Sequence, residues 1–313
     1  MQQHLLATSA KLVAAAVVAA ACGAATPGTT PNTHSEAFPV TINEAAGASV
    51  TIAKQPHRIV SLSPTATEML YAIDAGPQVV AVDDQSNYPA SAPMTKLSGF
   101  TPNIEAIAAY TPDLVVASDD TSGLVHGLAA LSIPTLIEPA AKNLGGTYAQ
   151  ISQLGTATGH GAAADSVNRK IGSDVAGIVA SLPHPARTLS LYHELDDTYY
   201  SATSNTFIGQ AYALFGLKNI ADGATATAPD YPQLSAEYIV ASSPDLIVLA
   251  DTKCCHQDLH TVSARPGWSS IAAVKSGQVI GVDDDVASRW GPRVVDFLRL
   301  IAPHIRALET SSP

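Results

Sequence analysis

The sequence predicts an α/β protein with two lobes, each built around a parallel-rich sheet, joined by one long helix. Its 313 residues exceed the usual domain of about 100–200 residues. Short β-branched runs alternate with helical stretches in both halves, which is the pattern of parallel sheets with helical crossovers. In addition, one phrase, E-x-I-x-x-x-x-P-D-L-[VI]-V, occurs twice, beginning at Glu105 and at Glu237.

The N-terminus has the pattern of an export signal, residues 1–21. The apolar run "LVAAAVVAAA" ends at Ala21 and has the length of a signal-peptide core, too short for a bilayer span of about 20 residues. Cys22 follows three alanines and resembles the site at which bacterial lipoproteins are cleaved and acylated, although Ala19 stands where Leu is usual. The alternative is a secretory peptide cut near Ala21. Either cleavage exports the protein, and lipid on Cys22 would anchor it to the membrane.

Residues 22–39 then form a Thr/Pro/Ala/Gly tract that we expect to be a flexible linker. An N-terminal α/β lobe is expected over residues 40–143. Its elements are strand "RIVSL", helix "TEMLYAI", strand "PQVVAVDD", helix "NIEAIAAY", strand "DLVVA", helix "GLVHGLAAL" and strand "PTLIEP".

Residues 144–184 are expected to link the lobes by a helix. The stretch 162–182 lacks Pro and lies between Gly161 and Pro183, which predicts one helix about 30 Å long at 1.5 Å per residue. The β-α alternation resumes in a C-terminal lobe, residues 185–313. Its elements are "RTLSLYHE", helix "TFIGQAYALFG", helix "AEYIVASS", strand "DLIVLA", helix "SSIAAVKSG", strand "QVIGVD" and a final helix "VVDFLRLIAPHIRAL".

Most residues of the repeated phrase are explained by the helix and buried strand that we expect it to form. Asn103 and Ser235 are expected helix N-caps, and the prolines of each "PDL" end the helix before a buried strand. Architecture does not require Glu105 and Glu237, although an acid in the first helical turn gains about 0.3–1 kcal/mol from the helix dipole. Their matched positions in both halves favour a function.

Four ordered stretches together resemble the ABC-importer solute-binding proteins of the iron-siderophore, haem and cobalamin class. They are "PHRIVSLSPTATEMLYAIDAG", "NIEAIAAYTPDLVVA", "LSAEYIVASSPDLIVL" and "RPGWSSIAAVKSGQVI", and the resemblance covers about residues 40–300. It implies two Rossmann-like lobes bridged by one long helix, with the ligand in the cleft between them. It also implies that Glu105 and Glu237 dock onto arginines of the two permease subunits. Asp74, where the family's helix normally carries Leu, is a minor departure.

Ligand-binding residues are expected in the loops that follow the strands, because open α/β sheets bind ligands outside the carboxyl ends of their strands. Aromatic side chains there suit a flat ligand, Tyr or His suits haem iron, and arginines suit carboxylates. The candidates are Tyr88, Tyr192, His193, Tyr199, Tyr200, Arg289, Trp290 and Arg293.

The adjacent Cys254 and Cys255 suggest a vicinal disulfide in an exported protein. Zinc held by this pair with His256 and His260 is the less favoured alternative, because the spacing matches no common structural site. We therefore expect no metal. "GHGAAA" lacks the preceding strand of a dinucleotide site, and G-x-S-x-G and H-E-x-x-H are absent, so no enzyme activity is expected.

The formal net charge of −11 argues against a nucleic-acid partner. We expect a monomeric, lipid-anchored protein on the outer face of the cytoplasmic membrane that delivers a small-molecule iron chelate to an ABC permease. A ferric siderophore or haem is the first expectation and cobalamin the alternative. A non-transporting envelope protein that uses the same scaffold to bind a partner is the third interpretation.

Overall fold

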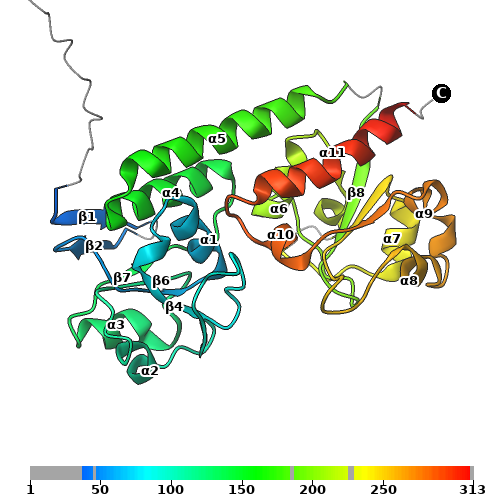
Figure 1. The fold of residues 1–313 in the computed structure, drawn as a ribbon. Coiled ribbons are helices and arrows are strands. Elements are labelled where there is room, and N and C mark those ends of the chain that lie inside the picture. The colour runs from blue at the N-terminus through cyan, green and yellow to red at the C-terminus, as the bar shows by residue number, and fades with distance from the viewer. Residues whose placement is uncertain (1–36, 45–46, 184–186, 225–228, 311–313) are drawn as a thin grey trace, which may run out of the picture. The chain divides into compact units, whose positions relative to one another are not determined.

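The computed structural model describes residues 37–44, 47–183, 187–224 and 229–310, which belong to one compact unit (Figure 1). The expected signal peptide, the lipidated Cys22 and nearly all of the linker lie outside the described residues. Among the residues described, no helix is both long enough and apolar enough to cross a membrane.

The first sheet has five parallel strands in the order β5-β4-β3-β6-β7. The strands are β3 (Ile59–Leu62), β4 (Val79–Asp83), β5 (Met94–Leu97), β6 (Leu114–Ala117) and β7 (Thr135–Ile137). Every residue of β3 and β6 is buried, as expected for the central strands of a sheet covered on both faces. We call this sheet with its helices the N-terminal lobe.

The second sheet repeats this topology with four parallel strands in the order β9-β8-β10-β11. The strands are β8 (Ser190–Glu194), β9 (Lys218–Asn219), β10 (Leu246–Leu249) and β11 (Val279–Gly281). Read along each sheet, β8 takes the place of β3 and β10 that of β6. We call this sheet with its helices the C-terminal lobe, and the predicted α/β fold class is confirmed.

Helices α4 (Leu144–Thr158), α5 (Gly161–Ala180) and α11 (Val294–Thr310) contact one another in sequence, α4 against α5 and α5 against α11 (Figure 1). The predicted long helix is α5, which is continuous over 20 residues. The linking segment nevertheless contains two helices, because α4 ends at Gly159 in the left-handed conformation, with φ of 78°. Sequence patterns also missed the antiparallel hairpin of β1 (Val40–Asn43) and β2 (Ser49–Ile52).

The remaining helices are short and connect the strands. In the N-terminal lobe they are α1 (Pro64–Ala72), η1 (Gly76–Gln78), α2 (Ile104–Ala108), η2 (Thr121–Gly123) and α3 (Leu124–Ala129). In the C-terminal lobe they are α6 (Phe207–Ala213), η3 (Ile220–Gly223), α7 (Ala236–Ser242), α8 (Leu259–Ser263), η4 (Trp268–Ser270), α9 (Ala272–Ser276) and α10 (Asp284–Ser288).

The repeated phrase forms the same local structure in both lobes. Asn103 and Ser235 cap α2 and α7 as predicted, their side chains accepting bonds from the amides of Ala106 and Tyr238 at 2.9 and 3.2 Å. After each helix, the residue before the proline has a positive φ, 47° at Thr111 and 40° at Ser243. The chain then enters the buried strand.

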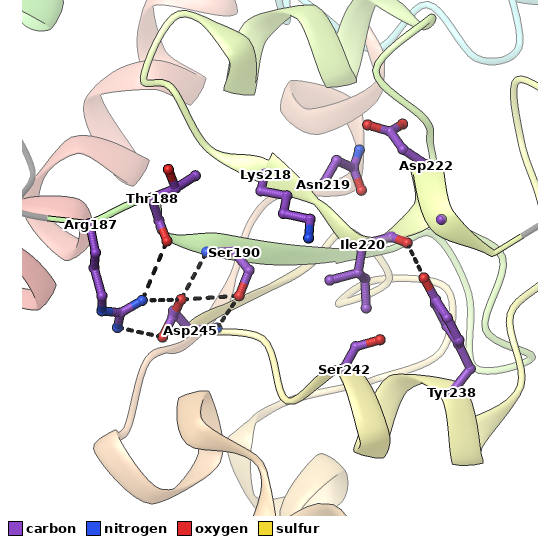
Figure 2. A pocket seen from close by; sticks show the side chains of 11 residues that line it. Arg187, Thr188, Ser190, Lys218, Asn219, Ile220, Asp222, Tyr238, Ser242 and Asp245 are labelled. Atoms are coloured by element: carbon purple, nitrogen blue, oxygen red, sulfur yellow. Dashed lines mark hydrogen bonds and ion pairs between the residues drawn. The ribbon is translucent and has the colours of Figure 1, made fainter.

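The aspartate of each phrase ties the amino ends of two neighbouring strands together. Asp113 accepts bonds from the amides of His57 and Arg58, which lead into β3. Asp245 accepts a bond from the Ser190 amide at 2.8 Å and both guanidinium nitrogens of Arg187 (Figure 2). Backbone amides at strand entries are thereby satisfied by charge-assisted bonds.

We expect Asp245→Ala to lower the free energy of unfolding by about 2–3 kcal/mol, because it leaves the half-buried Ser190 amide without its charged acceptor. Denaturant titration measures this loss of stability, with an m-value that is expected to equal that of wild type. Glu237→Ala on the same phrase is the control and should cost at most about 1 kcal/mol, the contribution of an acid in the first helical turn. Equal stability of the two variants would contradict the structural role of Asp245.

Candidate functional site

Exposed aromatic side chains gather on the loops that follow the carboxyl ends of the strands. Tyr88 follows β4, Phe100 follows β5, and Tyr200 follows β8, with exposed fractions of 48, 77 and 41%. Tyr231 belongs to the same region, because its neighbours Pro232 and Gln233 pair with the backbone of the Tyr200–Ser201 segment. Parallel strands bring these loops to one edge of each sheet, where ligands of such folds bind.

Phe100 is a candidate that sequence reasoning missed. The preceding Gly99 lies against the end of β3, and a Cβ there would collide with the Leu62 carbonyl oxygen and approach the Asp83 carboxylate. Only glycine allows this close passage, which holds the following Phe100 out toward solvent. The sequence places Phe100 in a loop, but the close backbone approach that exposes it is visible only in the structure.

A buried carboxylate joins the two lobes. Glu68 of α1 is 3% exposed and accepts a bond from Arg289 at 2.8 Å. It also accepts two bonds from Arg293, at 2.9 and 2.6 Å. Sequence reasoning missed Glu68 as well, although an acid inside the apolar run "TEMLYAI" was a usable signal. Glu68 thus binds two guanidinium groups from the opposite lobe.

Both terminal nitrogens of the Arg289 guanidinium group donate two hydrogen bonds each. Besides Glu68 it donates to the Asn87 side chain at 3.0 Å, to the Gln85 carbonyl at 2.9 Å and to Asp285 at 2.8 Å. Asn87 in turn donates to Asp285 at 2.9 Å. We call Glu68, Gln85, Asn87, Asp285, Arg289 and Arg293 the interlobe network.

The interlobe network engages both arginines that were expected to bind a ligand. Arg289 is only 8% exposed and its charge is matched by Glu68 and Asp285, so it offers no free cation to a ligand carboxylate. Arg293 is also paired with Glu68, and its guanidinium carbon lies 4.5 Å from the centre of the Tyr88 ring. The arginines therefore connect the lobes and support Tyr88.

The other expected ligand residues differ in how far their side chains are buried. Tyr192 and His193 lie inside β8 with no exposed surface, so in this structure neither side chain reaches a ligand. Tyr199 is half-buried and packs on Trp268 and over Arg265. Trp290 donates its indole N–H to Gln150 at 2.9 Å, which turns it toward α4. Tyr88 and Tyr200 remain exposed.

A pocket of about 390 Å³ lies between the lobes beside the interlobe network. It is lined from α1, from the loop after β4 and from the start of α11 by Glu68, Tyr71, Ala72, Tyr88, Pro89, Pro292, Arg293 and Asp296. Its volume is at the low end of small-molecule sites, about 300–1,000 Å³. A larger ligand would need the exposed aromatic loops as well.

Acids dominate the exposed charge on the same loops. Asp84, Asp119, Asp120, Asp197 and Asp230 are all exposed there. Of the lysines, Lys253 is paired with Asp283 and Asp285, and Lys142 lies 3.9 Å from Asp230. The loop surface therefore has a negative potential that disfavours anions.

A buried ionic cluster closes the carboxyl end of β8 and β10. Arg265 donates to both oxygens of the fully buried Glu194, at 2.7 and 2.6 Å, and lies over the Trp268 ring. Neither carboxyl oxygen of the buried Asp251 has a hydrogen-bond partner among the described residues. Burial and the neighbouring Glu194 raise the pKa of Asp251 to about 8, so this carboxyl is protonated at neutral pH.

A second pocket, of about 590 Å³, lies at the opposite edge of the C-terminal sheet (Figure 2). Arg187, Ser190 and Lys218 contribute to it where β8 and β9 begin, and Tyr238 lines it from α7. Tyr238 donates its hydroxyl to the Ile220 carbonyl at 2.8 Å. Its place at the amino ends of the strands separates it from the aromatic loops.

Glu105 and Glu237 are both exposed in the first turns of α2 and α7. Cys254 and Cys255 are free thiols in the loop after β10. Within the described part of the chain, His, Cys, Asp and Glu form no group of three or more arranged to hold a metal ion.

Comparisons with known proteins agree with this fold. The model of the periplasmic binding protein family matches residues 59–286. An uncharacterized ABC transporter substrate-binding lipoprotein of Bacillus subtilis is 32% identical over 311 residues, 95% of each chain. A cobalamin-binding protein of Halobacterium salinarum is 32% identical over 288 residues, 87% of this chain and 77% of the relative.

Among solved structures, the periplasmic heme-binding protein RhuT from Roseiflexus sp. RS-1 superposes with a TM-score of 0.71 at 21% identity, covering 81% of this chain and 99% of that one. Two α/β lobes with a long helix and a loop-lined site define a class of solute-binding proteins. The chain belongs to the periplasmic binding protein family, as a substrate-binding protein of ABC transporters.

The free energy of unfolding should fall as pH rises from about 4 to about 8. Burial raises the pKa of Glu138 to about 8, as it does for Asp251, whereas an unfolded carboxyl titrates near 4. The folded chain therefore binds more protons in this window, and each site contributes up to about 1.4 kcal/mol per pH unit. Burial lowers the pKa of His193 to about 3, which opposes this trend below about pH 6.5.

Urea titrations at pH 6.5 and pH 8 test this linkage on the steepest part of the curve. Asp251→Asn and Glu138→Gln should each flatten the dependence, because an amide cannot ionise. If wild type and both variants lost equal stability between the two pH values, the raised pKa values of Asp251 and Glu138 would be contradicted.

Proposed function

We propose that this protein captures cobalamin or a closely related corrinoid outside the cytoplasmic membrane and delivers it to an ABC permease. The observation that carries the proposal is the pairing of both expected ligand arginines with Glu68, which leaves an acidic, aromatic-rich rim. The cobalamin-binding relative from Halobacterium salinarum supports the same ligand class. This reverses the order expected from sequence, in which iron chelates came first.

The charge of the ligand is the physical basis for this order. Haem presents two propionates and many ferric siderophores are anionic, so both would need cations that the loops supply only in paired form. The corrin periphery of cobalamin carries amides, which hydrogen-bond without a counter-charge, and its flat face suits exposed aromatic rings. The acidic rim therefore lowers the affinity for such a ligand only slightly.

Haem or a ferric chelate is the second candidate, favoured by the exposed Tyr88 and Tyr200. A tyrosine phenolate can ligate haem iron. The structural relative RhuT is described as heme-binding, but at 21% identity this likeness concerns the fold alone. A non-transporting envelope protein remains the third interpretation, in which no such ligand binds.

Delivery and location complete the proposal. We propose that lipid on Cys22 holds the exported chain at the outer face of the membrane, and that it works as a monomer without catalysis. The Bacillus subtilis relative is named a lipoprotein, which supports the anchor. Glu105 and Glu237 supply one exposed carboxylate from each lobe, which suits two equivalent permease subunits.

Titration of the purified protein with cyanocobalamin, haemin and a ferric hydroxamate, followed by tryptophan fluorescence, tests the ligand. We expect cyanocobalamin to bind most tightly, and Tyr88→Ala or Phe100→Ala each to weaken it by about 2–10-fold, the value of one aromatic contact. Leu131→Ala is the control, because Leu131 is 52% exposed in the loop entering the amino end of β7. Tighter binding of haemin than of cyanocobalamin would overturn the proposed order of ligands. No fluorescence change with any of the three compounds would favour the envelope interpretation.

Uptake of the ligand by cells tests the docking residues. Glu105→Lys with Glu237→Lys should nearly abolish uptake by placing like charges against permease arginines, while ligand affinity and stability stay near wild type. Asp165→Lys, at an exposed acid on α5, is the control for each single glutamate reversal, which changes the net charge by the same amount. Normal uptake by the double variant would remove the docking role.

A further inference from the structure

The loop after β10 presents two adjacent thiols near the proposed ligand site. Cys254 is exposed and Cys255 is half-buried. The chain has one other cysteine, Cys22, far away in sequence. Desolvation and a hydrogen bond with the Cys255 thiol raise the pKa of Cys254 to about 12, so this thiol is protonated at neutral pH.

The backbone around these thiols is tied down on both sides. The amides of Lys253 and Cys254 both donate to the Asp284 carboxylate, each at 3.1 Å. On the other side, the Cys255 amide donates to the Asp251 carbonyl, and the Cys255 carbonyl accepts from Gln257 at 2.9 Å. A change in the Cys254–Cys255 peptide unit must therefore disturb these bonds.

The same loop is joined to the interlobe network through one side chain. The Lys253 ammonium donates to Asp285 at 2.7 Å. Asp285 accepts from Arg289 at 2.8 Å and from Asn87 at 2.9 Å, and Arg289 donates to Glu68. A continuous chain of charged bonds thus runs from the residue beside the thiols to the contact between the lobes.

A disulfide between adjacent residues is strained. Neighbouring Cα atoms are about 3.8 Å apart, whereas disulfide-bonded cysteines usually have Cα atoms about 4.4–6.8 Å apart. Strained and exposed disulfides are the readily reduced ones that serve regulation. The Cys254–Cys255 bond would therefore be reversible and would distort the anchored loop.

We propose that Cys254 and Cys255 form a reversible dithiol–disulfide switch that alters the interlobe network through Lys253 and Asp285. A small-molecule disulfide is the oxidant. One cysteine attacks it, forming a mixed disulfide and releasing one thiol. The second cysteine then attacks the protein sulfur of that adduct, closing the Cys254–Cys255 bond and releasing the second thiol with its proton. The protein loses two electrons and two protons, and the oxidant gains them.

The switch is tested in the chain carrying Cys22→Ser, treated with oxidised glutathione or with reductant. Intact mass should show the loss of two hydrogen atoms with no retained adduct. Hydrogen exchange should quicken at the Lys253 and Cys254 amides and change in residues 85–87 and 285–289. Cys255→Ser is the matched variant, and it should keep glutathione as an adduct on Cys254 because no second thiol can close the ring.

Ligand affinity is measured in a separate experiment, which rests on the proposed function. Oxidised and reduced protein should differ at least about fivefold in affinity for cyanocobalamin, the low end of measured coupling between sites. If cyanocobalamin does not bind in either state, the proposed function fails while mass and exchange still decide the switch. A persistent adduct on wild type, a disulfide-linked dimer, or unchanged exchange in residues 85–87 and 285–289 would overturn the switch.

Discussion

The Glu68 carboxylate is the interaction on which the arrangement of this protein depends. A buried charge costs several kcal/mol unless it is paired, and Glu68 solves this by accepting bonds from two arginines of the opposite lobe. Each arginine is satisfied only when the lobes lie as they do, because Arg289 also needs Gln85 and Asn87. The contact therefore favours one arrangement of the lobes, in addition to the packing of α4, α5 and α11.

The same pairing determines what the cleft offers a ligand. With both arginines neutralised and Lys142 and Lys253 beside acids, the exposed loops keep their aspartates and aromatic rings. Recognition then rests on ring contacts and hydrogen bonds, which suits a large, flat, uncharged ligand. The repeated phrase has a different role, since Asp113 and Asp245 bind backbone amides at the strand entries while Glu105 and Glu237 stay exposed.

Local patterns predicted most of the fold because they act over short distances. The caps Asn103 and Ser235, the buried strands and α5 follow from neighbouring residues, and all were recognised. The hairpin β1–β2, the strands β5 and β9 and the break at Gly159 were missed, since short strands and an αL glycine have weak local signals. The site was harder to predict: Arg289 and Glu68 meet across 221 residues of sequence, and no local pattern tells a free arginine from a paired one.

The most direct test of this account is a double-mutant cycle between Glu68 and Arg289. Glu68→Gln, Arg289→Met and the double variant are compared with wild type by denaturant unfolding. Glu68→Gln should cost about 3–5 kcal/mol, since Arg293 loses its carboxylate partner and Arg289 keeps only Asp285. Arg289→Met should cost less, because Glu68 keeps both bonds from Arg293, and the double variant should cost clearly less than the sum of the two single losses. A coupling of at least about 1.5 kcal/mol is predicted. Losses that add within about 0.5 kcal/mol would contradict the claim that this pair joins the lobes.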